Sequence, residues 1–211
     1  MAKKSNIVKA KVTIKGVRPI LWHWFGPHAL PLEAQERTGV AGNDPEEWRK
    51  TFLATKEGQL YVDNTYIFGC IRDGAGYTKI QRRSAKTFVA ATLQVEEERV
   101  LIDRFMPKGY KDMPTDEFPA DPDELVYLDI RSAVNPTTKR RNIRYRVAAS
   151  PGWKATFHIV WDPTVMPRDI MHSILIDAGA LCGLADGRNI GFGRFEVEEF
   201  KVVEDAAKKT A

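Results

Sequence analysis

The feature that most constrains this chain is a glycine-rich segment near its end, which contains Gly187, Gly191 and Gly193. The segment stands between a stretch with helical hydrophobic spacing and a stretch with the alternation of a strand. Because glycine adopts positive φ values readily, such a segment can turn sharply and approach another chain closely. Arg188 and Arg194 could bind phosphates, and Phe192 could stack on a base. The alternative is an ordinary loop whose arginines are only solvated.

Hydrophobic spacing predicts the elements on either side of this loop. Residues 7–15 and 153–161 alternate between apolar and polar side chains, which is typical of half-buried strands. Residues 168–183 carry apolar side chains at helical spacing, with Gly183 as a C-cap, and a final strand is expected from Arg194 to about Val203. No helix is expected to begin at the loop, so a helix dipole cannot help it to bind an anion. The amides around Gly187, Gly191 and Gly193 could still form a nest for a phosphate.

The middle of the chain predicts a second strand, a helix and a third strand. Residues 60–69 are expected to be a strand, residues 70–77 to open a helix, and residues 95–104 to form another strand. Helical spacing would place a set of cations on one broad face, namely Lys79, Arg82, Arg83 and Lys86. Of these cations, Lys79, Arg82 and Arg83 are candidates for nucleic-acid contact.

Residues 26–58 are expected to form an insertion after the first strand, with a short helix from about Asn43 to Thr55. The strand before the insertion ends in an aromatic run of Trp22, His23, Trp24 and Phe25. This run could be core, a subunit contact or a platform for bases. Residues 106–124 are rich in proline and acid, which indicates an irregular and exposed connection.

Residues 125–149 have the signature of a β-hairpin, with two alternating segments joined through a turn that contains Asn135 and Pro136. The tip and the return strand carry five cations, which are Lys139, Arg140, Arg141, Arg144 and Arg146. An edge strand uses charge to avoid aggregation. Five cations exceed that need, so we expect this hairpin to contact phosphates.

This order of elements predicts an α+β fold. Without the insertion and the basic hairpin, a βαββαβ ferredoxin-like (RRM-like) sheet remains. We expect residues 1–211 to form one domain, in which the insertion occupies residues 26–58 and the hairpin, residues 125–149, projects as a thumb.

Composition and charge limit the class of protein. The hydrophobic content of 43% and the charged content of 28% are those of a globular protein, and the net charge of +4 permits an anionic partner. Cys70 and Cys182 are far apart in the sequence, so they indicate neither a zinc cage nor a disulfide framework. The sequence has no apolar run of membrane-spanning length and no signal peptide, so we expect a cytoplasmic protein.

Three segments together resemble the RAMP superfamily of CRISPR effector complexes. The segment Phe68-Gly69-Cys70-Ile71-Arg72-Asp73-Gly74-Ala75 resembles that family's strand-to-helix turn, which leads into a helix bearing arginines or lysines. Residues 187–196 are similar to its glycine-rich loop, and the basic hairpin is similar to the thumb of backbone subunits. The first turn lacks the usual proline-glycine-serine character, and the chain is short for a backbone subunit. The resemblance implies a ferredoxin-like palm, RNA contacts through residues such as Arg72, filament assembly along RNA and no cofactor.

Catalysis is not the expected activity. RAMP endonucleases that process guide RNA can use a histidine near the end of the first strand, which makes His23 and His28 the candidates for a metal-independent cleavage. No nucleophile or second acid–base group is recognisable by its spacing from either histidine. His158 and His172 fit ordinary positions on a strand and a helix.

The sequence therefore favours a non-catalytic nucleic-acid-binding subunit that oligomerises along a single strand. The expected partners are single-stranded nucleic acid (RNA being favoured by the resemblance), other copies of the chain and other subunits of a complex. The alternative is a phage-encoded protein, which either binds single strands or makes only protein contacts in an assembly. RNA and DNA cannot be distinguished from composition, because 2′-hydroxyl contacts leave no mark in it.

Overall fold

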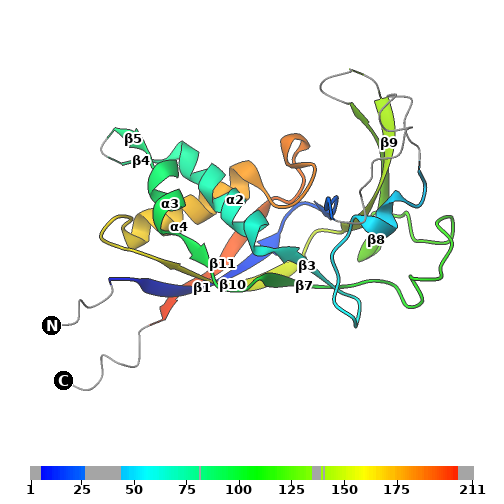
Figure 1. The fold of residues 1–211 in the computed structure, drawn as a ribbon, viewed down its shortest axis with the longest axis horizontal. Coiled ribbons are helices and arrows are strands. Elements are labelled where there is room, and N and C mark those ends of the chain that lie inside the picture. Colours follow the sequence, from blue (N-terminus) through cyan, green and yellow to red (C-terminus); the bar gives the residue numbers. More distant parts are fainter. Residues whose placement is uncertain (1–5, 27–43, 81, 135–138, 140, 204–211) are drawn as a thin grey trace.

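The computed structural model describes residues 6–26, 44–80, 82–134, 139 and 141–203. These residues contain three α-helices, three antiparallel β-sheets and several short 3₁₀ or π turns (Figure 1). This mixed architecture agrees with the predicted α+β class. No described helix is both long enough and apolar enough to cross a membrane.

The largest sheet has the strand order β11-β1-β10-β7-β3, and β6 pairs with β10. Every strand pair in it is antiparallel. Its strands are β1 (Val8–Gly16), β3 (Gln59–Asp63), β6 (Gln94–Val95), β7 (Arg99–Phe105), β10 (Lys154–Trp161) and β11 (Phe195–Val203). The predicted strands at 7–15, 153–161 and 194–203 are confirmed.

Three helices cover one face of this sheet, namely α2 (Asn64–Gly74), α3 (Lys86–Thr92) and α4 (Arg168–Asp177) (Figure 1). Apolar and polar side chains alternate along β1, so its apolar side chains all point to one face of the sheet. The helices cover that face, and Ala10, Val12 and Ile14 are completely buried in the core. A π turn (Ala178–Cys182) extends α4, and Gly183 ends it with a φ of 80°. The predicted glycine C-cap is therefore confirmed.

Helix α2 corrects the prediction for residues 60–75. The strand ends at Asp63, and the segment from Phe68 to Ala75, expected to be a strand-to-helix turn, lies within or at the end of α2. The Asp63 side chain accepts a hydrogen bond from the Thr65 amide at 2.9 Å, which caps the helix early. The residues Ile67, Cys70, Ile71 and Gly74 are buried at helical spacing.

The basic run after α2 is also arranged differently from the prediction. A 3₁₀ turn (Ala75–Tyr77) ends the helix, and the chain then forms a hairpin of β4 (Lys79–Ile80) and β5 (Arg83–Ser84). Arg82 adopts a φ of 68°, a left-handed conformation that a hairpin turn uses. Lys79, Arg82 and Arg83 therefore belong to a hairpin and do not share a helical face.

A separate sheet carries the predicted basic hairpin. Its strand order is β2-β9-β8, with β2 at Ile20–Leu21, β8 at Val126–Val134 and β9 at Arg141–Ala149. The two long strands pair from Val126↔Ala149 to Val134↔Arg141 and project from the body of the molecule (Figure 1). The predicted hairpin is confirmed, while residues 135–138 and Arg140 lie outside the described residues.

The aromatic run after β2 is divided between core and surface. Trp22 is buried and its Nε1 donates to the Tyr61 carbonyl at 2.8 Å, whereas Phe25 is 60% exposed. Trp22 is therefore part of the core and is not available as a base platform or a subunit contact. Residues 27–43 of the predicted insertion, including His28, lie outside the described residues.

The described part of the insertion packs against the hairpin. A 3₁₀ turn (Glu47–Lys50) takes the place of the expected longer helix, and Trp48 is completely buried. The Glu47 carboxylate accepts from Arg144, from the Tyr145 amide at 3.3 Å and from Nε2 of His23 at 3.0 Å. Burial alone would raise the pKa of Glu47, but its bonds to His23 and Arg144 outweigh this and hold the pKa below its ordinary value.

We expect Glu47→Gln to lower the free energy of unfolding at neutral pH by about 1–3 kcal/mol, because it breaks charge-assisted hydrogen bonds. A lowered pKa in the folded state means that the stabilisation is present above the ordinary pKa of 4.5 and is lost as the pH falls below it. Urea unfolding of both proteins at neutral and acidic pH measures the difference. The neighbouring Glu46→Gln is the control, since the Glu46 side chain is 49% exposed and its bonds to Arg49 and Thr115 should therefore contribute less. A difference that is equal at both pH values would contradict the assignment.

Candidate nucleic-acid interface

The glycine-rich loop turns back onto the start of the chain. Gly187, Gly191 and Gly193 have φ values of 71°, 93° and 68°, all in the region that favours glycine. The Gly193 amide donates to the Pro19 carbonyl at 2.7 Å, and its carbonyl accepts from the Leu184 amide at 2.9 Å. A Cβ atom on Gly193 would lie 2.0 Å from the Leu184 carbonyl oxygen. The glycine at this position is therefore required by the close approach of two backbone segments.

Four of the loop amides have acceptors within the protein. The amides of Ile190 and Phe192 donate to the Gly187 carbonyl at 3.0 and 3.2 Å, and the Gly191 amide donates to the Arg188 carbonyl at 3.1 Å. These bonds, with the one from Gly193 to Pro19, use four of the amides on which the expected phosphate nest would draw. The side chains of Arg188 and Arg194 are therefore the main groups that the loop offers to a ligand.

Phe192 is partly buried. It lies against a small apolar cluster of Leu21, Tyr127 and Ala148, which is separate from the main core. The guanidinium of Arg131, on β8, lies 4.5 Å from the centre of its ring. Phe192 thus joins the loop to the base of the projecting hairpin, and the arrangement does not favour the predicted stacking on a base.

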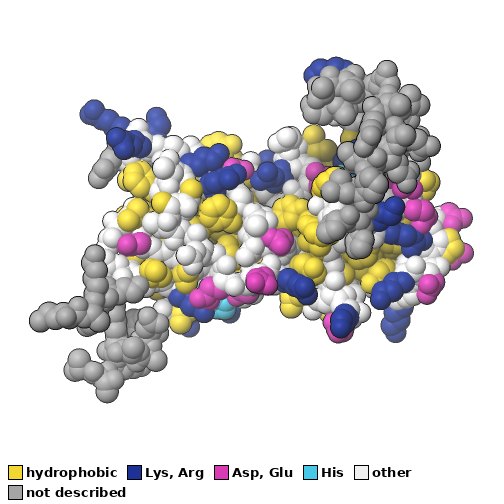
Figure 2. All heavy atoms as spheres, in the orientation of Figure 1, with side chains coloured by type: hydrophobic (Ala, Val, Ile, Leu, Met, Phe, Trp, Pro, Cys, Tyr) yellow, Lys and Arg dark blue, Asp and Glu magenta, His cyan; other side chains and the backbone are white. Residues whose placement is uncertain are grey.

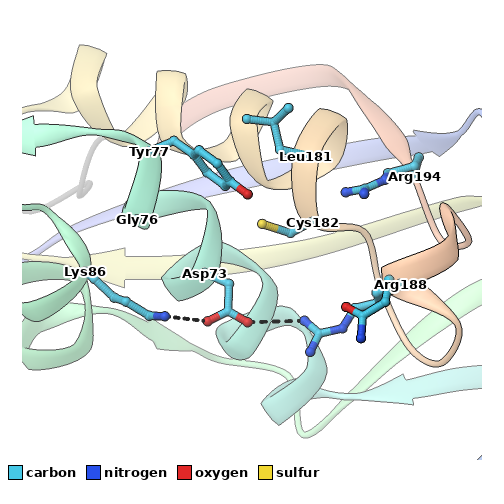
Figure 3. A pocket seen from close by; sticks show the side chains of 9 residues that line it. Asp73, Gly76, Tyr77, Lys86, Leu181, Cys182, Arg188 and Arg194 are labelled. Carbon is cyan, nitrogen blue, oxygen red and sulfur yellow. Dashed lines mark hydrogen bonds and ion pairs between the residues drawn. The ribbon is translucent and has the colours of Figure 1, made fainter. Parts of the chain in front are cut away.

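The loop arginines line an open hollow of about 540 Å³ between α2, α3 and the π turn (Figure 3). Its lining consists of Asp73, Gly76, Tyr77, Lys86, Leu181, Cys182, Arg188, Asn189 and Arg194. Three cations and one carboxylate give the lining a net charge of +2. The sequence predicted the arginines here but not Tyr77, although an aromatic residue directly before a basic run is a usable signal.

Asp73 organises the cations of the hollow. Its carboxylate oxygens lie 3.0 Å from Nζ of Lys86 and 3.3 Å from Nη1 of Arg188 (Figure 3). Arg72, from the neighbouring position on α2, is also 3.3 Å away. Burial alone would raise the pKa of Asp73, but Lys86 and Arg72 outweigh it and hold the pKa below its ordinary value. The carboxylate is therefore charged at neutral pH and holds these side chains in place.

Beside the hollow, the β4–β5 hairpin carries cations that have no internal partner. Lys79, Arg82 and Arg83 are exposed and form no ion pair within the part of the chain that the structure describes. Figure 2 shows Lys and Arg side chains over this end of the molecule and along the same edge. Tyr77, which is 63% exposed, connects this hairpin to the hollow.

The cations of the projecting hairpin are in a different situation. Arg144 pairs with Glu47, and Nε of Arg146, which is buried, lies 3.0 Å from the Asp186 carboxylate without reaching hydrogen-bond geometry. These two arginines attach the hairpin to the insertion and to the glycine-rich loop. Lys139 and Arg141 are exposed, and Arg140 lies outside the described residues.

The face of the large sheet opposite the helices is a poorer candidate interface. Three of its lysines are paired with glutamates, in Lys9–Glu96, Lys11–Glu199 and Lys154–Glu198. His158 Nδ1 is likewise 2.6 Å from Glu97. This pairing offsets the charge of Lys9 and Lys11 on the basic outer face of β1, and so weakens the attraction of that face for phosphates.

The remaining catalytic candidate is His23, whose ring nitrogen binds Glu47. Glu47 is itself occupied by Arg144 and the Tyr145 amide, so it is held as a structural partner. Within the described residues, no group of three or more His, Cys, Asp or Glu side chains is close enough to hold a metal ion.

Comparison with known proteins shows a similarity in fold. No protein-family model and no curated protein matches the sequence. A chain in the cryo-EM structure of the Type III-B Cmr-beta bound to cognate target RNA is similar, with a TM-score of 0.50 at 12% sequence identity. The match covers 94% of this chain and 61% of that one, so this chain spans less than two thirds of its neighbour's length.

Substitutions at two glycines test whether the loop is architectural. Gly193→Ala should destabilise the protein by more than about 3 kcal/mol, because its Cβ would overlap the Leu184 carbonyl. Gly191→Ala should cost only about 1–2 kcal/mol from its positive φ, since no atom lies within 4 Å of the added Cβ. Chemical unfolding measures both, and equal losses would contradict the close approach at Gly193. If the loop amides do not bind phosphate, folded Gly191→Ala should also bind RNA normally.

Proposed function

We propose that this chain is a non-catalytic RNA-binding subunit of a CRISPR-type ribonucleoprotein. The observation that carries the proposal is the positively charged hollow, which adjoins the unpaired cations of the β4–β5 hairpin on the helical side of the molecule. When lysines and arginines without internal partners neutralise phosphates, the counterions condensed on the nucleic acid are released. This release supplies affinity for any sequence. Exposed Tyr77 beside them adds a stacking surface, a combination typical of single-strand binding.

The proposed path of the strand runs from the β4–β5 hairpin, past the hollow, towards the projecting hairpin. The nucleic-acid-binding residues along it are Arg72, Lys79, Arg82, Arg83, Lys86, Arg188 and Arg194, with Lys139, Arg140 and Arg141 at its far end. We leave Arg144 and Arg146 out of this set because their side chains, 27% and 10% exposed, are held against Glu47 and Asp186. Arg72, Lys86 and Arg188 also pair with a carboxylate, that of Asp73, but their side chains remain at least 40% exposed. Gly187, Gly191, Phe192 and Gly193 shape the loop that presents the two arginines.

The fold supports the same assignment. A βαββαβ order can be followed along the chain through β1, α2, β7, β10, α4 and β11. Of these strands, β1 and β10 lie at the centre of the sheet. We infer a ferredoxin-like palm of the RAMP type, forming one domain with an insertion at residues 26–58 and a thumb at residues 125–149. A fold similar to a chain of an RNA-bound Type III-B Cmr-beta points in this direction.

Assembly along the strand is part of the proposal. A subunit that repeats along a strand needs a head-to-tail contact, which generates rings or filaments. Phe25 and the insertion are the candidates for that contact, because Phe25 is exposed while Trp22 is in the core. Light scattering with and without single-stranded RNA tests this, and a monomer under both conditions would contradict it.

Removing the unpaired cations tests the RNA path. The triple variant Lys79→Ala, Arg82→Ala, Arg83→Ala should weaken binding of any single-stranded RNA, because phosphate contacts carry no sequence information. The slope of log affinity against log salt should fall by roughly 0.7 for each phosphate interaction that the substitutions remove. Titrations of a labelled RNA at several salt concentrations measure both the affinity and the slope.

The matched control removes the same charge from the opposite face of the sheet. Lys9→Ala, Lys11→Ala, Lys154→Ala eliminates three lysines that pair with glutamates, so it should leave the salt slope unchanged. An equal loss in both triple variants would mean that only net charge matters and would refute the proposed path. A wild-type protein that binds no RNA or DNA would favour the purely structural alternative.

A further inference from the structure

The hollow is divided into two chemically different halves. On one side are Lys86 and Arg188, held by Asp73, with Arg194 at the end of the glycine-rich loop (Figure 3). On the other side the exposed apolar surface of Tyr77 and Leu181 meets the opening. Tyr77 is 63% exposed and Leu181 is 44% exposed, although both are large apolar side chains. A ligand that fits this lining has an anionic part and a flat apolar part.

We propose that the hollow binds a single nucleoside phosphate unit, with its phosphate against the cations and its base against Tyr77 and Leu181. This inference rests on the proposed function, because it names the ligand unit that the RNA-binding surface accepts at this point. A volume of about 540 Å³ lies within the ordinary range for a small-molecule site. A duplex would not expose a base to Tyr77, so the unit comes from an unpaired strand or from a free nucleotide.

The cations are prepared for a phosphate before it arrives. Asp73 fixes Lys86 and Arg188 at 3.0 and 3.3 Å, so less side-chain freedom is lost when a ligand binds. The lining remains positive after Asp73 is counted. One guanidinium nitrogen of Arg194, Nη1, is buried and has no hydrogen-bond partner among the described residues. An acceptor at this end of the hollow would satisfy it.

Substitution of Tyr77 tests the stacking half of the site. Tyr77→Ala should weaken the binding of a short labelled oligouridylate by about 5- to 150-fold, whereas Tyr77→Phe, which keeps the ring, should bind normally. Phe105→Ala is the matched control, because Phe105 is 56% exposed but lies on β7, on the uncovered face of the sheet. Circular dichroism and thermal melting establish that each variant is folded.

Cys182 supplies an independent readout, because it lines the hollow and is partly exposed, while Cys70 is buried. Bound oligouridylate or uridine monophosphate should slow alkylation of Cys182 by N-ethylmaleimide. Inorganic phosphate at equal ionic strength should not slow it, since it has no base to cover the thiol. The protection should disappear in Tyr77→Ala and persist in Tyr77→Phe. Alkylation of the buried Cys70, measured in the same samples, would reveal any general opening of the fold.

The outcomes separate this inference from the proposed function. One outcome is that oligouridylate binds with a normal salt slope, while Tyr77→Ala does not weaken binding and Cys182 is not protected from alkylation. This outcome would overturn the nucleotide site and leave RNA binding intact. Protection by uridine monophosphate that depends on Tyr77, without any oligonucleotide binding, would support the site and overturn the RNA-binding function. Absence of both binding and protection would overturn both.

Discussion

The close return of the glycine-rich loop onto residues 16–21 is the constraint on which the rest of this structure depends. After α4 the chain must reverse and enter β11 at the edge of the sheet, and Gly193 permits a backbone approach that any side chain would block. The same turn directs Arg188 and Arg194 into the hollow and Phe192 towards the base of the projecting hairpin. One loop therefore positions both the candidate ligand site and the element beside it.

Internal pairing decides which cations of a mildly basic protein are available to a partner. Arg144 and Arg146 hold the hairpin against Glu47 and Asp186, and three lysines of the uncovered sheet face pair with glutamates. Taking one partner from a buried pair leaves an uncompensated charge, so a ligand could recruit such arginines only at a cost in stability. The cations of the β4–β5 hairpin form no ion pair with any other described residue, so a ligand could bind them without that cost.

The hairpin and the hollow are physically connected through this loop. Arg146 pairs with Asp186, Arg131 lies over Phe192, and the Asp186 amide donates to the Leu21 carbonyl at 3.0 Å. A nucleic acid held by Arg188 and Arg194 would thus contact a segment whose position is shared with the hairpin. Under the proposed function, this arrangement would keep a bound strand in a constant position relative to the projecting hairpin.

The sequence by itself determined the elements whose signal is local. The alternation of β1 and β10, the apolar spacing of α4, the C-cap at Gly183 and the pairing of β8 with β9 all follow from side-chain periodicity and turn chemistry, and the structure confirms them. The positive φ values of the loop glycines were expected for the same reason. Arg188 and Arg194 were predicted as site residues from their place beside those glycines, and both line the hollow.

Only the tertiary structure decided which charges face a ligand and which side chains are buried. Helix α2 begins at Asn64 because Asp63 caps it and its buried stripe packs on the core, which outweighs the strand-like composition of residues 60–69. Phe192, Arg144 and Arg146 were predicted to contact nucleic acid, but each has a partner within the protein that is distant in the sequence. Tyr77, Lys86 and Arg188 meet in one hollow for the same reason: long-range packing, which local periodicity does not encode, brings α2, α3 and the loop together.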